Sequence, residues 1–431
     1  MLENMRNHTI TIGERDTWGG TDPVRLSRLD RRQHAYIIGK TGTGKSTLLR
    51  NMIVQDIAAG EGVGLIDPHG DLAIEVLDAI PPWRSRDVLY FNPSDAAFPI
   101  GFNPLHGAVG DARHLVASAI VSALKSVWRD SWGPRLEYIL YACVVAVAST
   151  ENGTILGVQR MLTDDGFRQS VIAQIDDPIV RSFWEREFAS YDRKFLSEAV
   201  APIQNKIGQL IMSPLIRNIL GQVRGRVEPR LMMDSGKIFI ANLGKGKLGE
   251  DKSNLLGSLL VSSFQTAAMS RSELAEENRR DWFLYVDEFQ NFATDSFASI
   301  LSEARKQRLC LTLAHQYTSQ LRHEVRDAVF GNAGTIIALR TSEADSEILA
   351  REFGGGYSPS TFATTANHHA HVKLLAQGAY GDPFLARLDG PIEAPYGRRK
   401  QIINRARSSH ATPRSVVEER IARWIGSSRF E

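Results

Sequence analysis

The chain has 431 residues, too many for one ordinary hydrophobic core, so we expect two domains or one domain with a large insertion. Hydrophobic residues make up 43% and charged residues 23%, as in an average globular protein, and a formal net charge of +2 excludes a polycation. The two cysteines, Cys143 and Cys310, lie in apolar runs and are expected to be buried thiols, so no disulfide framework is implied, which suits a reducing compartment.

The N-terminal region, residues 1–30, is polar and has the pattern of neither a signal peptide nor a membrane anchor. We expect two short strands there, at residues 8–13 and 24–29. The most apolar segment, residues 139–148, is shorter than the ~18–20 residues that a membrane span requires. We therefore expect a cytoplasmic protein with no segment inserted in a membrane.

The nucleotide-binding signal is the loop at residues 39–46, which reads GKTGTGKS and matches G-x-x-x-x-G-K-[ST]. It follows an expected strand, residues 35–38, and precedes an expected helix, residues 47–58, which is the context that the motif requires. Glycines let backbone N–H groups point at phosphate oxygens, and the helix adds its positive end. Lys45 is expected to reach the β- and γ-phosphates, and Ser46 to ligate Mg²⁺. The predicted nucleotide-binding residues are Gly39, Lys40, Thr41, Gly42, Thr43, Gly44, Lys45, Ser46 and Thr47.

A second expected strand, residues 63–66, ends in the turn Asp67-Pro68-His69-Gly70-Asp71. Asp67 and His69 are candidates for lining the nucleotide pocket, because α/β sheets place their sites at the carboxyl ends of strands. A Pro-Gly turn followed by a capping Asp71 explains the same residues without any function.

After another expected strand, residues 88–91, the pattern becomes helical between about residues 107 and 234. Apolar residues recur there at helical spacing, as in the stripe Leu136, Ile139, Leu140, Cys143 and Val147. This block predicts an all-α domain inserted into an α/β domain. The strand pattern returns at residues 237–241, followed by a Gly/Lys-rich loop at 244–249 and a helix at 252–269. The loop either contacts the phosphates of a polymer or is simply solvated.

The acidic partner of the phosphate loop is expected at Asp287 and Glu288, which end the apolar run Trp282-Phe283-Leu284-Tyr285-Val286. Asp287 is predicted to hold the hydrated Mg²⁺. Glu288 is predicted to polarise the attacking water as a general base.

Beyond a further expected strand, residues 309–313, a polar side chain at the strand tip can sense the γ-phosphate, and Gln316 is the candidate. Arg305 and Arg308 are both candidates for an arginine finger supplied to another subunit, or are surface residues of a helix.

The C-terminal part continues with an expected strand at residues 335–340 and a helix at 342–353. The histidines at 368, 369 and 371 resemble a metal cluster but have no carboxylate or cysteine at ligand spacing, so we favour a strand over residues 371–377. Residues 396–431 hold nine basic and three acidic residues, and an amphipathic helix is expected at 414–425. This basic tail either contacts nucleic acid or is a solvated face.

Together these segments resemble the HerA–FtsK superfamily of P-loop motor ATPases, and within it the type IV secretion coupling proteins of the TraD/TraG kind. The residues that carry the resemblance are 30–46, 67–72, 102–105, 237–257 and 283–316. The resemblance implies an α/β fold with a RecA-like P-loop core, a mainly parallel sheet and an inserted all-α domain. The implied domains are residues 1–106 with 235–395, the insertion 107–234, and the tail 396–431.

The resemblance also implies ATP and Mg²⁺ as cofactors, a hexameric ring with ATP at subunit interfaces, and DNA as partner. By position, Lys45, Glu288, Arg305 and Gln316 carry catalysis, while Ser46 and Asp287 hold the metal. Arg305 is favoured over Arg308 by its spacing to Gln316. Coupling proteins usually have N-terminal membrane helices, and here residues 1–30 are polar, so any membrane or secretion-channel anchor is expected to be a partner protein.

Three functions remain open from the sequence. The first is an ATP-driven DNA translocase in conjugation. The second is a regulatory or assembly ATPase of a defence or mobile-element complex that does not move DNA. The third is a scaffold that binds ATP without hydrolysing it, against which the Asp287-Glu288 pair argues.

Overall fold

The computed structural model describes residues 8–294, 297–376, 378–393 and 395–426. The chain divides into two compact units. We call the first, residues 1–91, 229–244 and 267–404, the sheet unit, and the second, residues 92–228, 245–266 and 405–431, the helical unit. The helical unit thus takes in residues 92–106, 245–266 and 405–431, which the predicted domain limits assign to the motor core and the tail.

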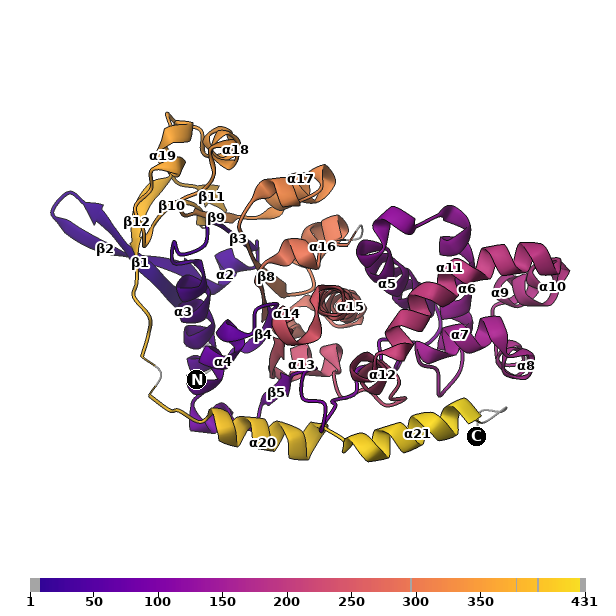
Figure 1. Cartoon of the computed structure of the whole chain (residues 1–431). Helices are drawn as coiled ribbons and strands as arrows, with labels where there is room; N and C mark the ends of the chain where they lie inside the picture. Colours follow the sequence, from indigo (N-terminus) through magenta and orange to yellow (C-terminus); the bar gives the residue numbers. More distant parts are fainter. Residues whose placement is uncertain (1–7, 295–296, 377, 394, 427–431) are drawn as a thin grey trace. The chain divides into compact units, whose positions relative to one another are not determined.

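The sheet unit is built on one mixed sheet (Figure 1). Its strand order is β2-β1-β12-β10-β9-β3-β8-β7-β4-β6-β5. The strands from β9 to β5 in this order are parallel, and β10, β12, β1 and β2 pair antiparallel. Their bounds are β1 Thr9–Thr17, β2 Gly20–Ser27, β3 Ala35–Ile38, β4 Gly62–Asp67, β5 Val88–Phe91, β6 Ile238–Asn242, β7 Trp282–Val286, β8 Leu309–His315, β9 Thr335–Ala338, β10 His369–Ala376 and β12 Phe384–Leu388, with the short β11 Ala379–Tyr380 paired to β10. This is the mainly parallel α/β sheet that the sequence predicts.

The parallel strands are short apolar runs because both faces of the sheet are covered. Every residue of β3, β7 and β8 is buried. The connecting helices of this unit are α2 Arg28–Arg31, α3 Lys45–Ala58, α4 Asp71–Asp78, α13 Pro229–Ser235, α16 Phe297–Glu303, α17 His323–Asn332, α18 Glu343–Phe353 and α19 Pro359–Ala363, and α20 Arg399–His410 begins in it.

The structure corrects several predicted elements. The N-terminal strands are longer and form a hairpin, and the second ends at Ser27, whose hydroxyl accepts a hydrogen bond from the backbone of Asp30 and starts α2. The favoured strand at 371–377 begins two residues earlier, at His369, and Gln377 lies outside the described residues. The Gly/Lys-rich loop holds a helical turn, α14 Lys245–Leu248. Strand β12 and helix α20 were not predicted.

The helical unit follows the predicted helical pattern. Its helices are α5 Ala112–Val127, α6 Pro134–Ala148, α7 Leu156–Thr163, α8 Asp165–Ile172, α9 Pro178–Ser182, α10 Phe188–Ser190, α11 Arg193–Met212, α12 Pro214–Leu220, α14, most of α15 Glu250–Ser270, and α21 Arg414–Gly426. The apolar stripe of α6 is buried, including Cys143. Helix α21 packs on α12 and confirms the predicted terminal helix.

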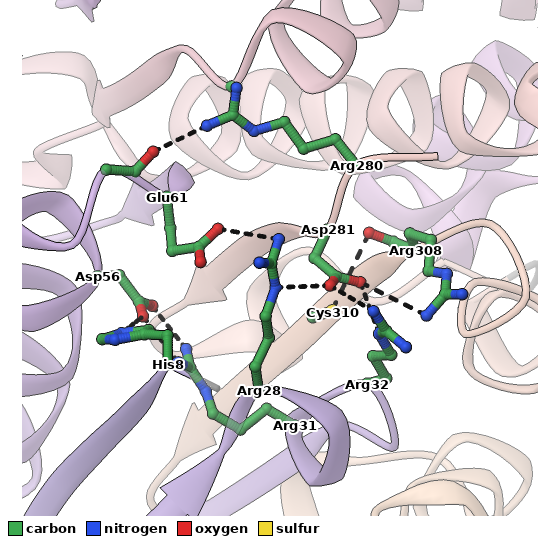
Figure 2. A network of polar contacts seen from close by, with 12 residues as sticks. His8, Arg28, Arg31, Arg32, Asp56, Glu61, Arg280, Asp281, Arg308 and Cys310 are labelled. Carbon is green, nitrogen blue, oxygen red and sulfur yellow. Dashed lines mark hydrogen bonds and ion pairs between the residues drawn. The ribbon is translucent and has the colours of Figure 1, made fainter. Parts of the chain in front are cut away.

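A polar network lies at the amino ends of the parallel strands in the sheet unit (Figure 2). Asp56 of α3 receives two hydrogen bonds from Arg31, at 2.7 and 2.6 Å, and one from the hydroxyl of Tyr285 at 2.5 Å. Asp281, just before β7, binds Arg28 and Arg32. The network therefore joins α2 and α3 to the start of β7 through the buried carboxylates of Asp56 and Asp281, while Arg28 and Arg32 are partly exposed.

Candidate active site

The phosphate loop connects the central strand β3 to α3. Gly42 and Gly44 have φ angles of 79° and 109°, which glycine adopts at little cost, and Gly44 is the N-cap of α3. A Cβ on Gly39 would lie 2.8 Å from the side chain of Leu339, the residue after β9, so the loop passes too close to it for a larger residue. The backbone N–H of Gly39 donates to His315 and that of Lys40 to Arg340, at 3.3 and 2.9 Å. Hydrogen bonds to residues at the ends of the neighbouring strands thus fix the start of the loop. The loop then leads into the first turn of α3, which contains Lys45, Ser46 and Thr47.

The acidic pair meets Lys45 at this edge of the sheet. The Nζ of Lys45 lies 2.5 Å from Oε1 of Glu288 and 3.8 Å from Oδ1 of Asp287. All three side chains are buried. Glu288 has a left-handed backbone, with φ 47°, and its N–H donates to the carboxylate of Asp287 at 3.0 Å. The chain turns sharply after β7 and directs both carboxylates toward Lys45.

The two carboxylates have opposite pKa shifts. Burial raises the pKa of Asp287 to about 6, against the opposing effect of Lys45, and the charge of Glu288 adds to the rise. Burial also acts to raise the pKa of Glu288, but the Lys45 ammonium and hydrogen bonds from Lys45, Gln290 and Gln316 together lower it. Glu288 is therefore ionised at neutral pH, as a general base that accepts a proton must be.

Gln316 lies beside the acidic pair. Its Nε2 donates to Oε1 of Glu288 at 2.8 Å, and its Oε1 accepts from the Thr41 hydroxyl at 3.1 Å. Gln316 thus links the phosphate loop to the carboxylate at the ends of β8 and β7. Gln290, which the sequence analysis did not single out, donates to Oε2 of Glu288 at 2.7 Å. Its position two residues after Glu288 is the only signal that the sequence offers for it.

His315 was also not predicted. It is fully buried at the end of β8, its Nδ1 lies 3.2 Å from the Tyr36 hydroxyl, and its carbonyl holds the N–H of Gly39. Burial, with a smaller contribution from the Lys45 charge, lowers its pKa to about 4. His315 is therefore neutral at pH 7, and its backbone carbonyl fixes the first residue of the phosphate loop.

Asp67 and His69 differ in their surroundings. The buried carboxylate of Asp67 accepts from the backbone N–H groups of His69 and Ala73, at 2.8 and 2.9 Å. Through these bonds Asp67 stabilises the turn that leads into α4. His69 is exposed.

The two candidate arginines precede β8 and therefore lie at the amino end of this strand, while the phosphate loop and the acidic pair lie at the carboxyl ends. Arg305 is exposed, just before β8, and donates to Oε1 of Gln33 at 3.2 Å. Arg308 instead pairs with Glu276 at 2.9 Å and approaches Asp281 at 4.0 Å. Strand β8, with seven residues, lies between Arg305 and Gln316, and at ~3.3 Å per residue the strand alone spans about 20 Å. Arg305 therefore does not meet Lys45 within one chain.

The histidines at 368–371 do not come together as a ligand set. His371 is mostly buried against the rings of Tyr357 and Phe362, and His369 bonds a backbone carbonyl. Within the described ranges there is no group of three or more His, Cys, Asp or Glu side chains arranged to hold a metal.

None of the helices in the described part of the chain combines the length and the apolar character that a membrane crossing demands.

Two family models match the chain. One, described as the type IV secretion-system coupling protein DNA-binding domain, matches residues 23–189. The other, described as the TraM recognition site of TraD and TraG, matches residues 282–372. Between them they contain the phosphate loop, the acidic pair and Gln316. No curated protein matches the chain.

Solved structures share the fold. The bacterial conjugative coupling protein TrwBdeltaN70 is 17% identical, with a TM-score of 0.60 over 86% of this chain and 89% of that one. The plasmid coupling protein TrwB in complex with ADP and Mg²⁺ gives 17% identity and a TM-score of 0.61, covering 90% and 96% of the two chains. VirB4 of Thermoanaerobacter pseudethanolicus is 14% identical, with a TM-score of 0.60 and coverage of 90% and 98%.

Proposed function

Because the chain belongs to the type IV secretion coupling proteins of the P-loop ATPase superfamily, we propose that it hydrolyses ATP to move DNA. The observation that carries the proposal is the meeting of Lys45, Glu288 and Gln316 at the carboxyl ends of adjoining strands. A P-loop lysine, an ionised carboxylate and a polar sensor are what phosphoryl transfer from ATP to water requires.

In the proposed reaction, the backbone N–H groups of the loop and Lys45 hold the phosphates. The Lys45 ammonium also lies 2.5 Å from Oε1 of Glu288, so a phosphate that binds Lys45 would free this carboxylate. Glu288, released from Lys45 but still held by Gln290, orients the attacking water and accepts its proton. Gln316 bonds both Glu288 and Thr41, and so senses the phosphate through the loop.

Mg²⁺ fits the residues at this site. Asp287 is a buried carboxylate whose pKa is raised by burial and by the charge of Glu288, and a cation would favour its ionised form. Ser46 follows Lys45 in the first turn of α3. We propose that Asp287 and Ser46 hold the ion, which would neutralise charge on the β- and γ-phosphates.

We further propose a homo-oligomer, with a hexamer as the expected ring, in which Arg305 completes a neighbour's site. Its exposure and its distance from its own phosphate loop support a role in another copy. A cytoplasmic location is proposed, with recruitment to a membrane or secretion channel through a partner protein. The match to a TraM recognition region at residues 282–372 supports a protein partner.

The test is the ATPase rate of the purified full chain with and without single- and double-stranded DNA. We expect stimulation that persists when the DNA sequence is scrambled and declines with salt, because a grip on phosphates is electrostatic. Glu288→Gln should retain ATP and lose turnover, since the amide cannot accept the proton. If a protein partner stimulates ATP hydrolysis and DNA does not, the chain is a regulatory ATPase and the motor proposal is wrong. If ATP is not hydrolysed under any of these conditions, the chain is a scaffold that only binds ATP.

A further inference from the structure

The helical unit contains a cavity of about 460 Å³ that is far in sequence from the phosphate loop. Its walls come from the segment that follows α12, residues 221–226, and from helix α21. This volume lies within the ~300–1,000 Å³ of ordinary small-ligand sites.

The charged groups of this cavity are all positive. Arg224, Arg226 and Arg420 line it, and no acidic residue does. All three are exposed, and among the described residues none has a side-chain hydrogen bond or ion pair.

Other arginines on the same helix are neutralised by neighbours. Arg414 pairs with Glu418 at 2.8 Å, and Arg423 pairs with Glu419 at 2.9 Å. The uncompensated positive charge is therefore concentrated at the cavity, where an anion would relieve the mutual repulsion of the three guanidinium groups.

The floor of the cavity is apolar. Val417 and Ile421 are buried, and the indole of Trp424 is half-buried beside them. The Trp424 ring is held by Phe167 at 5.7 Å between centroids and by the guanidinium of Arg160 at 5.1 Å. A fixed aromatic ring next to unpaired arginines offers both a stacking surface and phosphate-binding groups.

We propose that this cavity is a nucleotide-binding subsite, in which Arg224, Arg226 and Arg420 bind a phosphate and Trp424 supports the base. The ligand is a nucleotide, either free or as one unit of single-stranded DNA. The subsite is separate from the phosphate loop and does not require ATP hydrolysis. It gives the second unit of the chain a binding role of its own.

The experiment measures binding of a short fluorescein-labelled oligothymidylate to the full chain by anisotropy, without ATP and at several salt concentrations. Arg224→Ala, Arg226→Ala and Arg420→Ala are each compared with Arg423→Ala, which removes one charge from the same helix but outside the cavity. Each cavity variant should weaken binding and lower the slope of log K against log salt by about 0.7, the value for one phosphate contact to a single strand. Arg423→Ala should leave the slope unchanged. Circular dichroism confirms that all variants are folded.

Competition by AMP and by inorganic phosphate tests whether the cavity recognises a whole nucleotide or only its phosphate. Stacking is worth about 1–3 kcal/mol per base, so AMP should compete about 5- to 150-fold better than phosphate, and a cavity variant should remove that advantage. Cavity variants that bind like Arg423→Ala, or AMP that competes no better than phosphate, would overturn the proposal. DNA-stimulated ATPase activity that survives in the cavity variants with unchanged DNA affinity would refute the subsite and leave the motor standing. An AMP advantage that the original chain shows and the cavity variants lose, together with an ATPase that ignores DNA, would support the subsite and refute the motor.

Discussion

The Arg31–Asp56 pair offers the sharpest test of how the nucleotide-binding strand is anchored. Arg31 is 3% exposed and Asp56 is 0% exposed, and two hydrogen bonds of 2.7 and 2.6 Å join them. The ring of Phe283 covers the guanidinium at 3.9 Å. Asp56→Asn keeps the shape of the side chain but leaves the buried charge of Arg31 without its counter-ion.

Removal of one partner of such a pair costs about 3–5 kcal/mol, a large share of a total stability of about 5–15 kcal/mol. We therefore expect Asp56→Asn to lower the free energy of unfolding by about 3 kcal/mol or more. The double variant Arg31→Met/Asp56→Leu should be more stable than Asp56→Asn, because no unpaired charge remains buried.

Urea unfolding followed by tryptophan fluorescence and by circular dichroism measures these differences. Glu14→Gln is the matched control in the same unit, because the Glu14–Arg387 pair is exposed and such pairs contribute about 0–1 kcal/mol. A loss of less than 1 kcal/mol in Asp56→Asn, or a double variant less stable than Asp56→Asn, would refute the reasoning.

Three further outcomes are expected. Arg305→Ala should lose turnover but bind ATP. Mixing it with Lys45→Ala should restore part of the activity, because the intact arginine of one variant then meets the intact phosphate loop of the other. No recovery in mixed oligomers would contradict a role of Arg305 in a neighbour's site. Gln316→Ala should lower the ATPase rate with little change in stability, since its bonds are to Thr41 and Glu288 at the site, and a thermal melt run beside the assay checks this. Burial lowers the pKa of His34 to about 4, so the unfolded chain binds the proton first, and this group should lower stability by about 3 kcal/mol at most as pH drops from about 6.5 to 4. His315, with the same pKa, adds a fall of its own, so the contribution of His34 is the difference between the pH profiles of the original chain and His34→Gln; two equal profiles would contradict it.

The site was predictable from the sequence to the extent that its geometry is local. Lys45 ends the loop that follows the buried strand β3, Glu288 closely follows the buried strand β7, and parallel strands bring their carboxyl ends to one edge. Gln316 was predicted on the same ground. The contacts of these residues with one another are observed, while their chemical roles remain predictions.

The polar network and the arginine cavity were beyond the sequence because their partners are far apart in the chain. Arg32 and Asp281 are separated by 249 positions, and neither residue carries a periodic signal. Likewise, the cavity combines residues 221–226 with residues of α21, which no spacing rule connects. Strand β12 was missed because its exposed Leu385 is apolar, so the alternation of buried and exposed positions does not appear in the sequence of this short segment.

The order of the strands has a consequence for biosynthesis. Strand β3 leaves the ribosome early, but its partners β8 and β9 begin at Leu309 and Thr335. At about 5–20 residues per second, the central strand waits on the order of 15–60 s for neighbours on either side. During that time an apolar strand with unsatisfied backbone groups is open to wrong pairing, so the nascent chain should depend strongly on chaperones.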